Sequence, residues 1–467
     1  MKILAMAILF GLAATAWATE ERRSTEKEQT GLAVTIYNGD LALVKDARKV
    51  ELGQGENVLA WRNVSARMQP ETALLRSLDG RSLVLLEQNF DFDLLTPEKL
   101  LEKFVGQEVR VIKTHPTTGA ETFETARVLS ANSGVVLQFP DRIETGVPGR
   151  LAFDSVPGTL RDQPTLSMRL AVDRAGSQGL ELSYLTGGLS WKADYVAELS
   201  DAEDRLDLNG WVTLTNTSGA AYRDARLQLV AGEVNRVRPE QRPAMMFREA
   251  VPMAAAAPKM EEESLLDYHL YTLDRPTSIL ENQTKQVALL SAQGVVAGKE
   301  YVLQGANYYY YGRHGELGRK LKPAVYVQFE NKGGQMGLPL PKGVVRVYKK
   351  DRAGRAQFVG EDRIDHTARN ETVRLKLGEA FDVTADKKQT EFERVSDNVH
   401  ESAYAIEIRN AKKEPVEVKV VEPMPGDWRI LSSSQPHEKP SAGTATWRVK
   451  VPAEGKSVLT WRVRVKY

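Results

Sequence analysis

Alternation of apolar and polar residues is the feature of this chain that most narrows its possible folds. The stretch from Leu459 to Tyr467 alternates strictly, and the same period of two recurs in the segments 404–408, 416–420 and 447–451. Successive side chains of a β-strand point to opposite faces, so this pattern predicts strands with one buried and one wet face. We therefore predict that residues 385–467 form an antiparallel β-sandwich of the immunoglobulin-like type.

The same alternation appears in shorter runs near the start of the chain. Leu32, Val34 and Ile36 share one parity before the turn signal Asn38-Gly39, and further apolar runs of strand length follow. Residues 31–176 are therefore predicted to form an N-terminal β domain.

One short helix and a small barrel are predicted inside that domain. Thr96 is a good helix cap, Pro97 suits the first helical position, and Gly106 suits the end of the helix. Several short apolar runs follow at small spacing, which is typical of a small β-barrel. We predict an inserted module of the SH3-like type over residues 96–157.

A central β-sandwich is predicted over residues 177–384, interrupted by a segment of different composition. The window 236–263 holds four of the 21 prolines and four of the ten methionines, and no period survives across it. Such composition favours a mobile loop, with ordering on binding as the alternative. The predicted fold class is thus mainly β: tandem antiparallel immunoglobulin-like sandwich modules with a small inserted SH3-like barrel and one short helix.

The first residues are typical of an export signal. Lys2 precedes an apolar run of 15 residues, Ile3 to Trp17, and Ala16-Trp17-Ala18 supplies the small-x-small pattern for cleavage after Ala18. An uncleaved anchor is the alternative, but a spanning helix needs about 20 apolar residues. Residues 1–18 are therefore predicted to be a signal peptide, and the charged stretch 19–30 a disordered spacer. No transmembrane segment is predicted after cleavage.

Charge balance and cysteine content exclude several classes of function. Lys and Arg number 63 and Asp and Glu number 62, so no excess charge favours nucleic acid. The chain has no cysteine, which excludes disulfides, thiolate nucleophiles and Cys-ligated zinc. A periplasm-like or other envelope compartment fits an exported chain of this kind, and no cofactor is predicted.

No catalytic or metal-binding pattern is complete. Ser24-Thr25-Glu26-Lys27 and Ser396-Asp397-Asn398 match two parts of a serine acyl-transfer signature, but the required Lys-Thr-Gly does not occur. No two of the six histidines stand at the spacing that lets one helix face hold a metal, and His314-Gly315-Glu316 is an isolated triplet. These failures favour a protein that is not an enzyme, with no catalytic, cofactor or metal site.

Four consecutive tyrosines form the best candidate for ligand binding. Tyr308, Tyr309, Tyr310 and Tyr311 lie between Gly305 and Gly312, so at least two rings should point to each face of a loop or short strand. Exposed rings can stack on sugars. The alternative is that the run is half core and half edge. The tryptophans in strand-like patterns are expected to anchor the cores: Trp191, Trp211, Trp428, Trp447 and Trp461.

Several stretches resemble a known bacterial envelope family. They include EQNFDFDLLTPEKLLEKFVGQEV from Glu87 to Val109, YLTGGLSWKADYVAEL from Tyr184 to Leu199, and the later LPLPKGVVRVY and FVGEDRIDHT. They are similar to the family called domain of unknown function 4139, which is related to mucoidy-inhibitor-A-like proteins. The resemblance implies an exported, mainly β protein without an established activity, and it assigns no chemistry to any residue.

These observations together favour an exported cell-envelope protein that acts as a non-catalytic binding or structural module. Its partner would be an unknown envelope protein or a polysaccharide, because β modules with long loops are common binding scaffolds. Two alternatives stay open: an envelope hydrolase whose active site is assembled between modules, and an outer-membrane β-barrel whose last strand is Leu459 to Tyr467.

Overall fold

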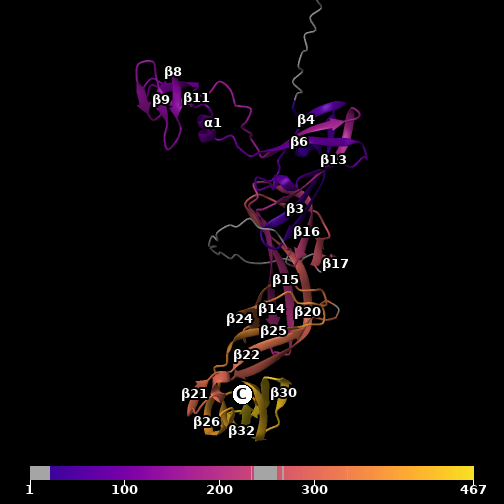
Figure 1. Ribbon diagram of the computed structural model, residues 1–467, viewed down its shortest axis with the longest axis vertical. Helices are drawn as coiled ribbons and strands as arrows, with labels where there is room; N and C mark the ends of the chain where they lie inside the picture. The colour runs from indigo at the N-terminus through magenta and orange to yellow at the C-terminus, as the bar shows by residue number, and fades with distance from the viewer. Residues whose placement is uncertain (1–20, 233, 236–259, 266–267, 334) are drawn as a thin grey trace, which may run out of the picture. The chain divides into compact units, whose positions relative to one another are not determined.

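The computed structural model describes residues 21–232, 234–235, 260–265, 268–333 and 335–467 (Figure 1). The chain forms two compact units. The first comprises residues up to 190 together with 215–228 and 275–284, and the second comprises 191–214, 229–274 and 285–467. The predicted signal peptide, residues 1–18, lies outside the described residues. The predicted boundaries of three β domains stay predictions.

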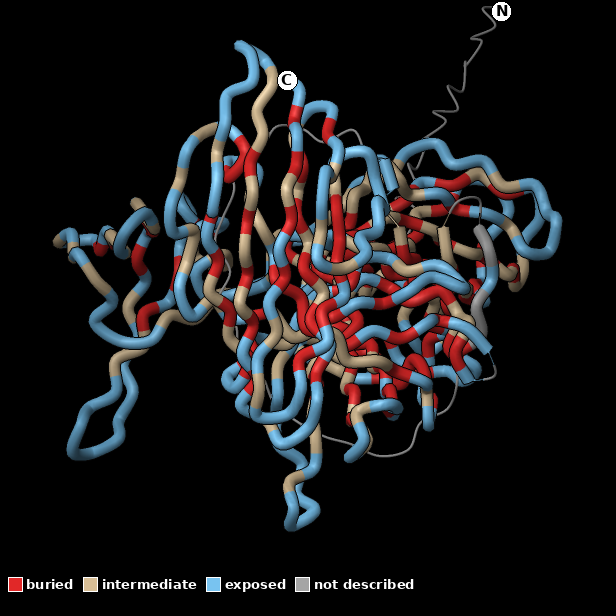
Figure 2. Tube along the Cα trace, turned by 90° about the horizontal axis from the view of Figure 1, so that it is seen from below, coloured by how far each residue is buried: buried red, intermediate tan, exposed pale blue. Residues whose placement is uncertain are grey.

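The fold is mainly β, as the alternation predicts. Buried and exposed residues alternate along the strands (Figure 2). A single α-helix, α1 (Pro97–Lys103), occurs in the described part of the chain, with three short 3-10 helices: η1 (Glu26–Glu28), η2 (Pro70–Thr72) and η3 (Asn307–Tyr310). No helix in the described ranges has the length and apolar character needed to span a membrane.

The first unit contains two sheets that continue the predicted strands. One has the order β1-β4-β12-β6, and the other contains the series β16-β2-β3-β13-β5, with β19 beside β16. The bounds are β1 (Glu21–Ser24), β2 (Gln29–Tyr37), β3 (Leu41–Leu52), β4 (Gly55–Arg62), β5 (Leu74–Ser77), β6 (Leu83–Asp91), β12 (Thr165–Val172), β13 (Gly176–Thr186), β16 (Tyr222–Ala231) and β19 (Thr277–Ile279).

The expected disordered spacer is wrong for residues 21–30. Glu21–Ser24 form β1, which pairs in parallel with β4, and Ser24 is fully buried. The backbone carbonyl of Ser24 accepts a hydrogen bond of 2.9 Å from the buried guanidinium of Arg48. Backbone pairing and one buried arginine thus order a stretch whose own side chains show no apolar period.

The inserted segment forms α1 and a separate five-stranded sheet. Thr96 caps α1 by accepting from the backbone N–H of Lys99, and Pro97 opens the helix, as the sequence predicts. The sheet has the order β10-β9-β8-β7-β11 and covers a small core that includes Phe104, Val111 and Leu137. Its strands are β7 (Glu108–Thr114), β8 (Glu121–Ser130), β9 (Val136–Gln138), β10 (Ile143–Thr145) and β11 (Arg150–Ala152).

The second unit contains a large branched sheet. Its main order is β24-β23-β14-β15-β20-β28-β31-β30, and β22 joins β20 to β25. The bounds are β14 (Leu189–Leu199), β15 (Arg205–Asn216), β20 (Gln283–Gln304), β22 (Ala324–Glu330), β23 (Gly343–Lys350), β24 (Ala356–Ile364), β25 (Thr372–Glu379), β28 (Val416–Pro423), β30 (Glu438–Ser441) and β31 (Thr444–Val451).

A second sheet of this unit shares a core with β28 and β31. Its order is β21-β26-β27-β32-β29, with bounds β21 (Glu316–Leu321), β26 (Val383–Ser396), β27 (Val399–Asn410), β29 (Asp427–Ser433) and β32 (Gly455–Lys466). The common core contains the buried rings of Trp428, Trp447 and Trp461. It also contains residues of β20 and η3, so this core recruits chain from before residue 385. Of the other predicted anchors, Trp191 is buried and Trp211 is half-buried.

The predicted loop 236–263 is only partly described. Residues 236–259 lie outside the described residues. Met260–Leu265 form β17, which pairs antiparallel with β18 (Tyr268–Leu273), and Met260 is buried. The prediction of a loop is therefore wrong for residues 260–263, because backbone pairing orders a stretch in which three acidic residues hide the strand period.

Candidate ligand-binding surface

The four consecutive tyrosines form η3 and the residue that ends it. The backbone N–H of Tyr311 donates to the carbonyl of Tyr308 at 3.3 Å, which closes the 3-10 turn. This turn divides the run: Tyr309 and Tyr310 are buried, whereas Tyr308 and Tyr311 are each 56% exposed. The expectation of two rings on each side holds, but the backbone is helical rather than a strand or open loop.

The backbone of the turn is fastened to β26, β27 and the last residue of the chain. The hydroxyl of Tyr404 donates to the carbonyl of Tyr309 at 2.7 Å, and the hydroxyl of Tyr467 donates to the carbonyl of Tyr310 at 2.5 Å. The side-chain amide of Gln389 donates to the carbonyl of Gly312 at 3.0 Å. Three side chains thus satisfy carbonyls that a short helix leaves without partners.

A buried ion pair lies beneath the turn. Lys387 donates from Nζ to Glu422 Oε1 at 2.5 Å, and the two side chains are only 2% and 1% exposed. The hydroxyl of Tyr310 donates to the other carboxylate oxygen at 2.9 Å. The ammonium also lies 4.0 Å from the centre of the Tyr309 ring, close enough for a cation–π interaction. The inward-facing tyrosines are therefore fixed by charge as well as by burial.

Burial shifts the pKa values of these groups in opposite directions. It lowers the pKa of Lys387, and the charge of Glu422 only partly opposes this. It raises the pKa of Tyr310 well above 10, with the nearby negative charge of Glu422 adding to the effect. It raises the pKa of Tyr309 to about 12. All three shifts favour the uncharged form of the group, as desolvation requires.

Gly305 explains how the chain leaves β20 so close to this carboxylate. Its N–H donates to the carbonyl of Val421 at 2.8 Å, which places it directly beside Glu422. A Cβ at position 305 would overlap the carboxylate of Glu422. The glycine therefore allows the backbone to pass over the ion pair before it turns into η3.

Each outward-facing ring contacts a further aromatic side chain. Tyr311 stacks on Tyr467, with ring centres 5.0 Å apart and planes at 26°. Tyr467 meets the edge of His400 at 5.2 Å, and on the other side Tyr308 meets His314 at 5.6 Å. Tyr467 is 39% exposed. We call Tyr308, Tyr311 and Tyr467 the tyrosine surface.

The sequence predicts the exposed tyrosines of the run but not Tyr467 or the ion pair beneath the turn. Of the four predicted ligand-binding residues, burial removes Tyr309 and Tyr310 from contact with any ligand in solution, and Tyr308 and Tyr311 remain accessible. The alternation predicts Tyr467 as the last residue of a strand, in a sandwich or in a barrel, and not as part of a binding surface. Lys387 and Glu422 were not singled out, although both stand at positions that share the parity of buried residues on their strands.

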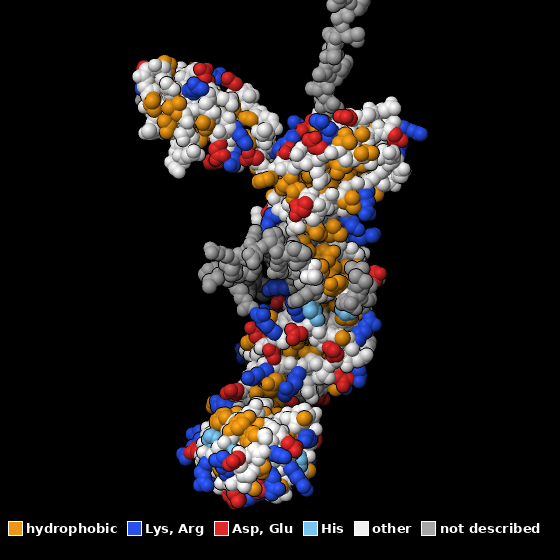
Figure 3. Space-filling view, viewed as in Figure 1, with side chains coloured by type: hydrophobic (Ala, Val, Ile, Leu, Met, Phe, Trp, Pro, Cys, Tyr) orange, Lys and Arg blue, Asp and Glu red, His pale blue; other side chains and the backbone are white. Residues whose placement is uncertain are grey.

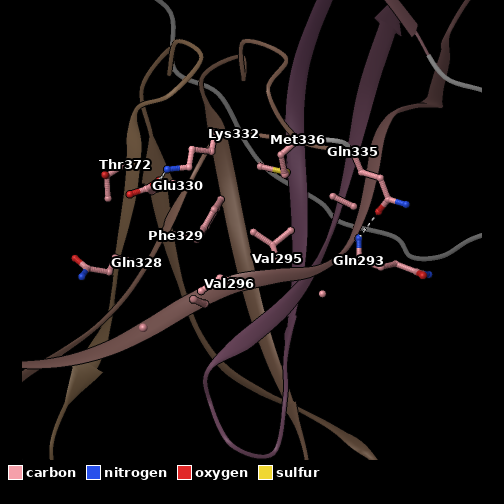
Figure 4. Close-up of a pocket in the computed structure, with 15 residues that line it drawn as sticks. Gln293, Val295, Val296, Gln328, Phe329, Glu330, Lys332, Gln335, Met336 and Thr372 are labelled. Atoms are coloured by element: carbon pink, nitrogen blue, oxygen red, sulfur yellow. Dashed lines mark hydrogen bonds and ion pairs between the residues drawn. The ribbon is translucent and has the colours of Figure 1, made fainter.

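A second candidate site is a cleft at β20. It has a volume of about 1060 Å³ and is lined by residues 292–298 of β20, the end of β22, Thr372 and the segment that follows Glu330. Figure 4 shows Val295 and Met336 pointing toward one another, with Gln293 joined to Gln335 by a hydrogen bond. Glu330 and Lys332 form an ion pair at its rim.

The two parts of the incomplete serine signature, at Ser24 and Ser396, belong to different compact units. Ser24 is buried in β1, and Ser396 donates to its own neighbour Asn398. His314 contacts Tyr308 and its ring nitrogen lies 3.2 Å from that residue's carbonyl oxygen. Among the described residues, no group of three or more His, Asp or Glu side chains is placed to hold a metal ion.

Residues 180–467 match the family described as Domain of unknown function (DUF4139). The chain belongs to this family. The resemblance seen in the sequence is confirmed over these residues, which include both the tyrosine surface and the cleft at β20. The segment from Glu87 to Val109 lies before the matched region. No curated protein matches the chain.

Proposed function

We propose that this protein is an exported, non-catalytic binding protein of the cell envelope, which holds a polysaccharide on the tyrosine surface. Export rests on the signal-like sequence of residues 1–18, with cleavage after Ala18 and a periplasmic or envelope location. We also propose that the sheets around residues 385–467 are an immunoglobulin-like sandwich and that the insert at 96–157 is SH3-like, since both classes are frequent binding scaffolds.

The stacked pair of Tyr311 and Tyr467 is the observation that carries the proposal. Sugar rings present C–H groups that stack on the faces of aromatic rings, and a wet site needs such rings to be exposed. Both rings are accessible, and the hydroxyl of Tyr467 is held by the carbonyl of Tyr310. Because the rings are fixed before a ligand arrives, binding costs little side-chain entropy.

Polar side chains beside these rings suit a ligand with many hydroxyl groups. Over the face in view in Figure 3, Lys and Arg side chains are interspersed with Asp and Glu side chains. His314, whose ring meets that of Tyr308, supplies a polar group beside the rings. A polysaccharide uses both elements, stacking for affinity and side-chain donors for orientation.

The test is a screen of envelope polysaccharides, followed by titration of the best ligand against variants. Tyr311→Ala should weaken binding about fivefold, because one aromatic contact contributes roughly 1 kcal/mol. Phe358→Ala is the matched control, since Phe358 is an equally exposed aromatic residue on β24 with 56% exposure. Equal losses in the two variants, or no polysaccharide that binds, would contradict the proposal. Release of sugar fragments during the titration would contradict the non-catalytic part.

A further inference from the structure

The cleft at β20 borders a strand edge that has no strand beside it. In the described part of the chain, β20 pairs with β15, β22 and β28. The ladder with β22 runs from Ala297 opposite Phe329 to Val302 opposite Ala324, and it goes no further. The β28 ladder begins only at Tyr301. Residues 292–296 of β20 therefore have β15 on one edge, and their other edge faces the cleft.

A side chain takes the place that a strand would occupy on that edge. The backbone N–H of Gln293 donates to Oε1 of Gln335 at 2.7 Å (Figure 4). On the opposite edge, the N–H of Gly294 donates to Asp207 and the N–H of Ala297 donates to the carbonyl of Asp204, both on the β15 side. Gly294 adopts φ +63°, and its N–H and that of Ala297, three residues later, both point toward β15, so the strand is irregular between these two residues.

The walls of the cleft suit the side chains of an extended polypeptide. Val296 is 69% exposed, and the floor is formed by the buried side chains of Phe329 and Met336. Phe329 is the one aromatic residue among the described lining residues, and with 3% exposure it offers no face for a sugar. The charged lining residues Glu330 and Lys332 neutralise each other at 2.5 Å. The cleft thus favours an uncharged segment with apolar residues.

We propose that an extended, uncharged segment of a partner protein binds in this cleft as an added strand beside residues 292–296 of β20. Main-chain hydrogen bonds to the free edge hold the segment, and every second side chain of the segment packs toward Phe329 and Met336. Gln335 caps the edge when the segment is absent and is displaced when it binds. This proposal is independent of the polysaccharide proposed for the tyrosine surface.

The experiment is selection of a displayed library of random ten-residue peptides on the full-length protein. The selected peptides should be uncharged and should alternate apolar and polar residues. Versions of the best peptide are then made with N-methyl groups on alternate residues. Methylation of one alternate set should abolish binding and methylation of the other should leave it intact, because only one set of N–H groups faces β20. Equal effects of both sets, or no selected peptide, would overturn the proposal.

Two substitutions in the protein give opposite expected results. Gln335→Ala removes the competing cap, so the affinity for the selected peptide should rise about fivefold. Val296→Lys places a charge on the edge, which should lower the affinity about tenfold. Val458→Lys is the matched control, because Val458 is 48% exposed on β32 and does not line the cleft. Weaker binding by Gln335→Ala would overturn the role of the cap. If Gln335→Ala self-associates and binds no peptide, the edge of β20 pairs with a second copy of this chain, and the proposal is overturned.

Discussion

The two compact units each bury an ion pair, and the two pairs are surrounded in different ways. In the first unit, Arg48 donates to Asp46 at 2.6 Å, with side chains 1% and 7% exposed. Its guanidinium also donates to the backbone carbonyls of Ser24 and Arg62, and the indole N–H of Trp61 donates to Asp46 at 2.9 Å. This pair therefore connects β1, β3 and β4 through directed hydrogen bonds.

In the second unit, Lys387 donates to the carboxylate of Glu422, and aromatic rings surround its ammonium group. Its ammonium lies 4.0 Å from the centre of Tyr309, 5.4 Å from Trp461 and 5.8 Å from Tyr404. Arginine offers five donors in a fixed fork, whereas lysine is a compact charge that suits a cation–π environment. The difference teaches that the first pair holds strands together, while the second holds aromatic rings in place under the tyrosine surface.

The largest expected effect is on the Arg48 pair. Asp46→Ala should destabilise the first unit by about 3–5 kcal/mol, because it leaves a buried guanidinium without its counter-charge. Hydrogen exchange of β3 and β4 amides under native conditions measures the loss. Asp154→Ala is the control: its pair with Arg110 is solvent-exposed on both sides and should contribute less than about 1 kcal/mol. If Asp46→Ala destabilises the protein no more than Asp154→Ala does, the buried pair of Arg48 and Asp46 does not hold the strands together.

Alkaline pH should lower the free energy of unfolding of the second unit, by less than the loss expected for Asp46→Ala. Burial raises the pKa of Tyr404 to about 12, so the unfolded chain releases this proton near pH 10 and the folded chain near pH 12. The stabilisation is therefore complete below pH 10 and is lost as the pH rises to 12, about 1 kcal/mol by pH 11 for Tyr404. Lys387 has the opposite effect on stability: because its pKa is lowered in the folded state, its contribution to the free energy of unfolding increases as the pH rises to 10.5.

Urea unfolding at pH 9 and pH 11, followed by tyrosinate absorbance, measures this loss. Tyr404→Phe should make the unfolding free energy less dependent on pH over that interval. An unchanged dependence would show that Tyr404 does not contribute to it.

The smallest effect is expected when both charges of the second pair are removed together. Lys387→Met with Glu422→Gln keeps an acceptor for the hydroxyl of Tyr310 and should change the free energy of unfolding by less than about 1 kcal/mol. The corresponding change Arg48→Met with Asp46→Asn leaves the carbonyls of Ser24 and Arg62 without a donor and should cost about 2–4 kcal/mol. Thermal unfolding of both variants compares them. Equal costs would break the comparison between the two pairs.

The parts of the fold that were predictable have a local cause in the sequence. Strict alternation places β27 and β32 correctly, because each has one buried face. The helix α1 follows from its cap at Thr96 and the proline at its first position. Four consecutive bulky residues lead us to expect some rings inside and some outside, but the 3-10 turn decides which ones, because a strand would point the adjacent Tyr309 and Tyr310 to opposite faces.

The parts that were missed depend on partners distant in the sequence. β1 has charged side chains and is ordered by β4 and Arg48, which its own sequence does not show. The free edge of β20 depends on where β22 ends, and the stack on Tyr311 depends on Tyr467, 156 residues later by sequence number. One signal was present: Lys387 stands at the inward parity of Val383 and Ala385, where a charge requires a buried partner.

Because Gly305 has no side chain, it restricts which residues relatives of this protein can carry at the positions that surround it. A methyl group there would collide with the carboxylate of Glu422, so the carboxylate would have to leave its contacts with Lys387 and Tyr310. Relatives that carry alanine or a larger residue where this chain has Gly305 should carry a shorter residue in place of Glu422, and should then lack a partner for a lysine at the position of Lys387. Correlated substitution at the positions of Gly305, Glu422 and Lys387 would show that the family has kept the ion pair.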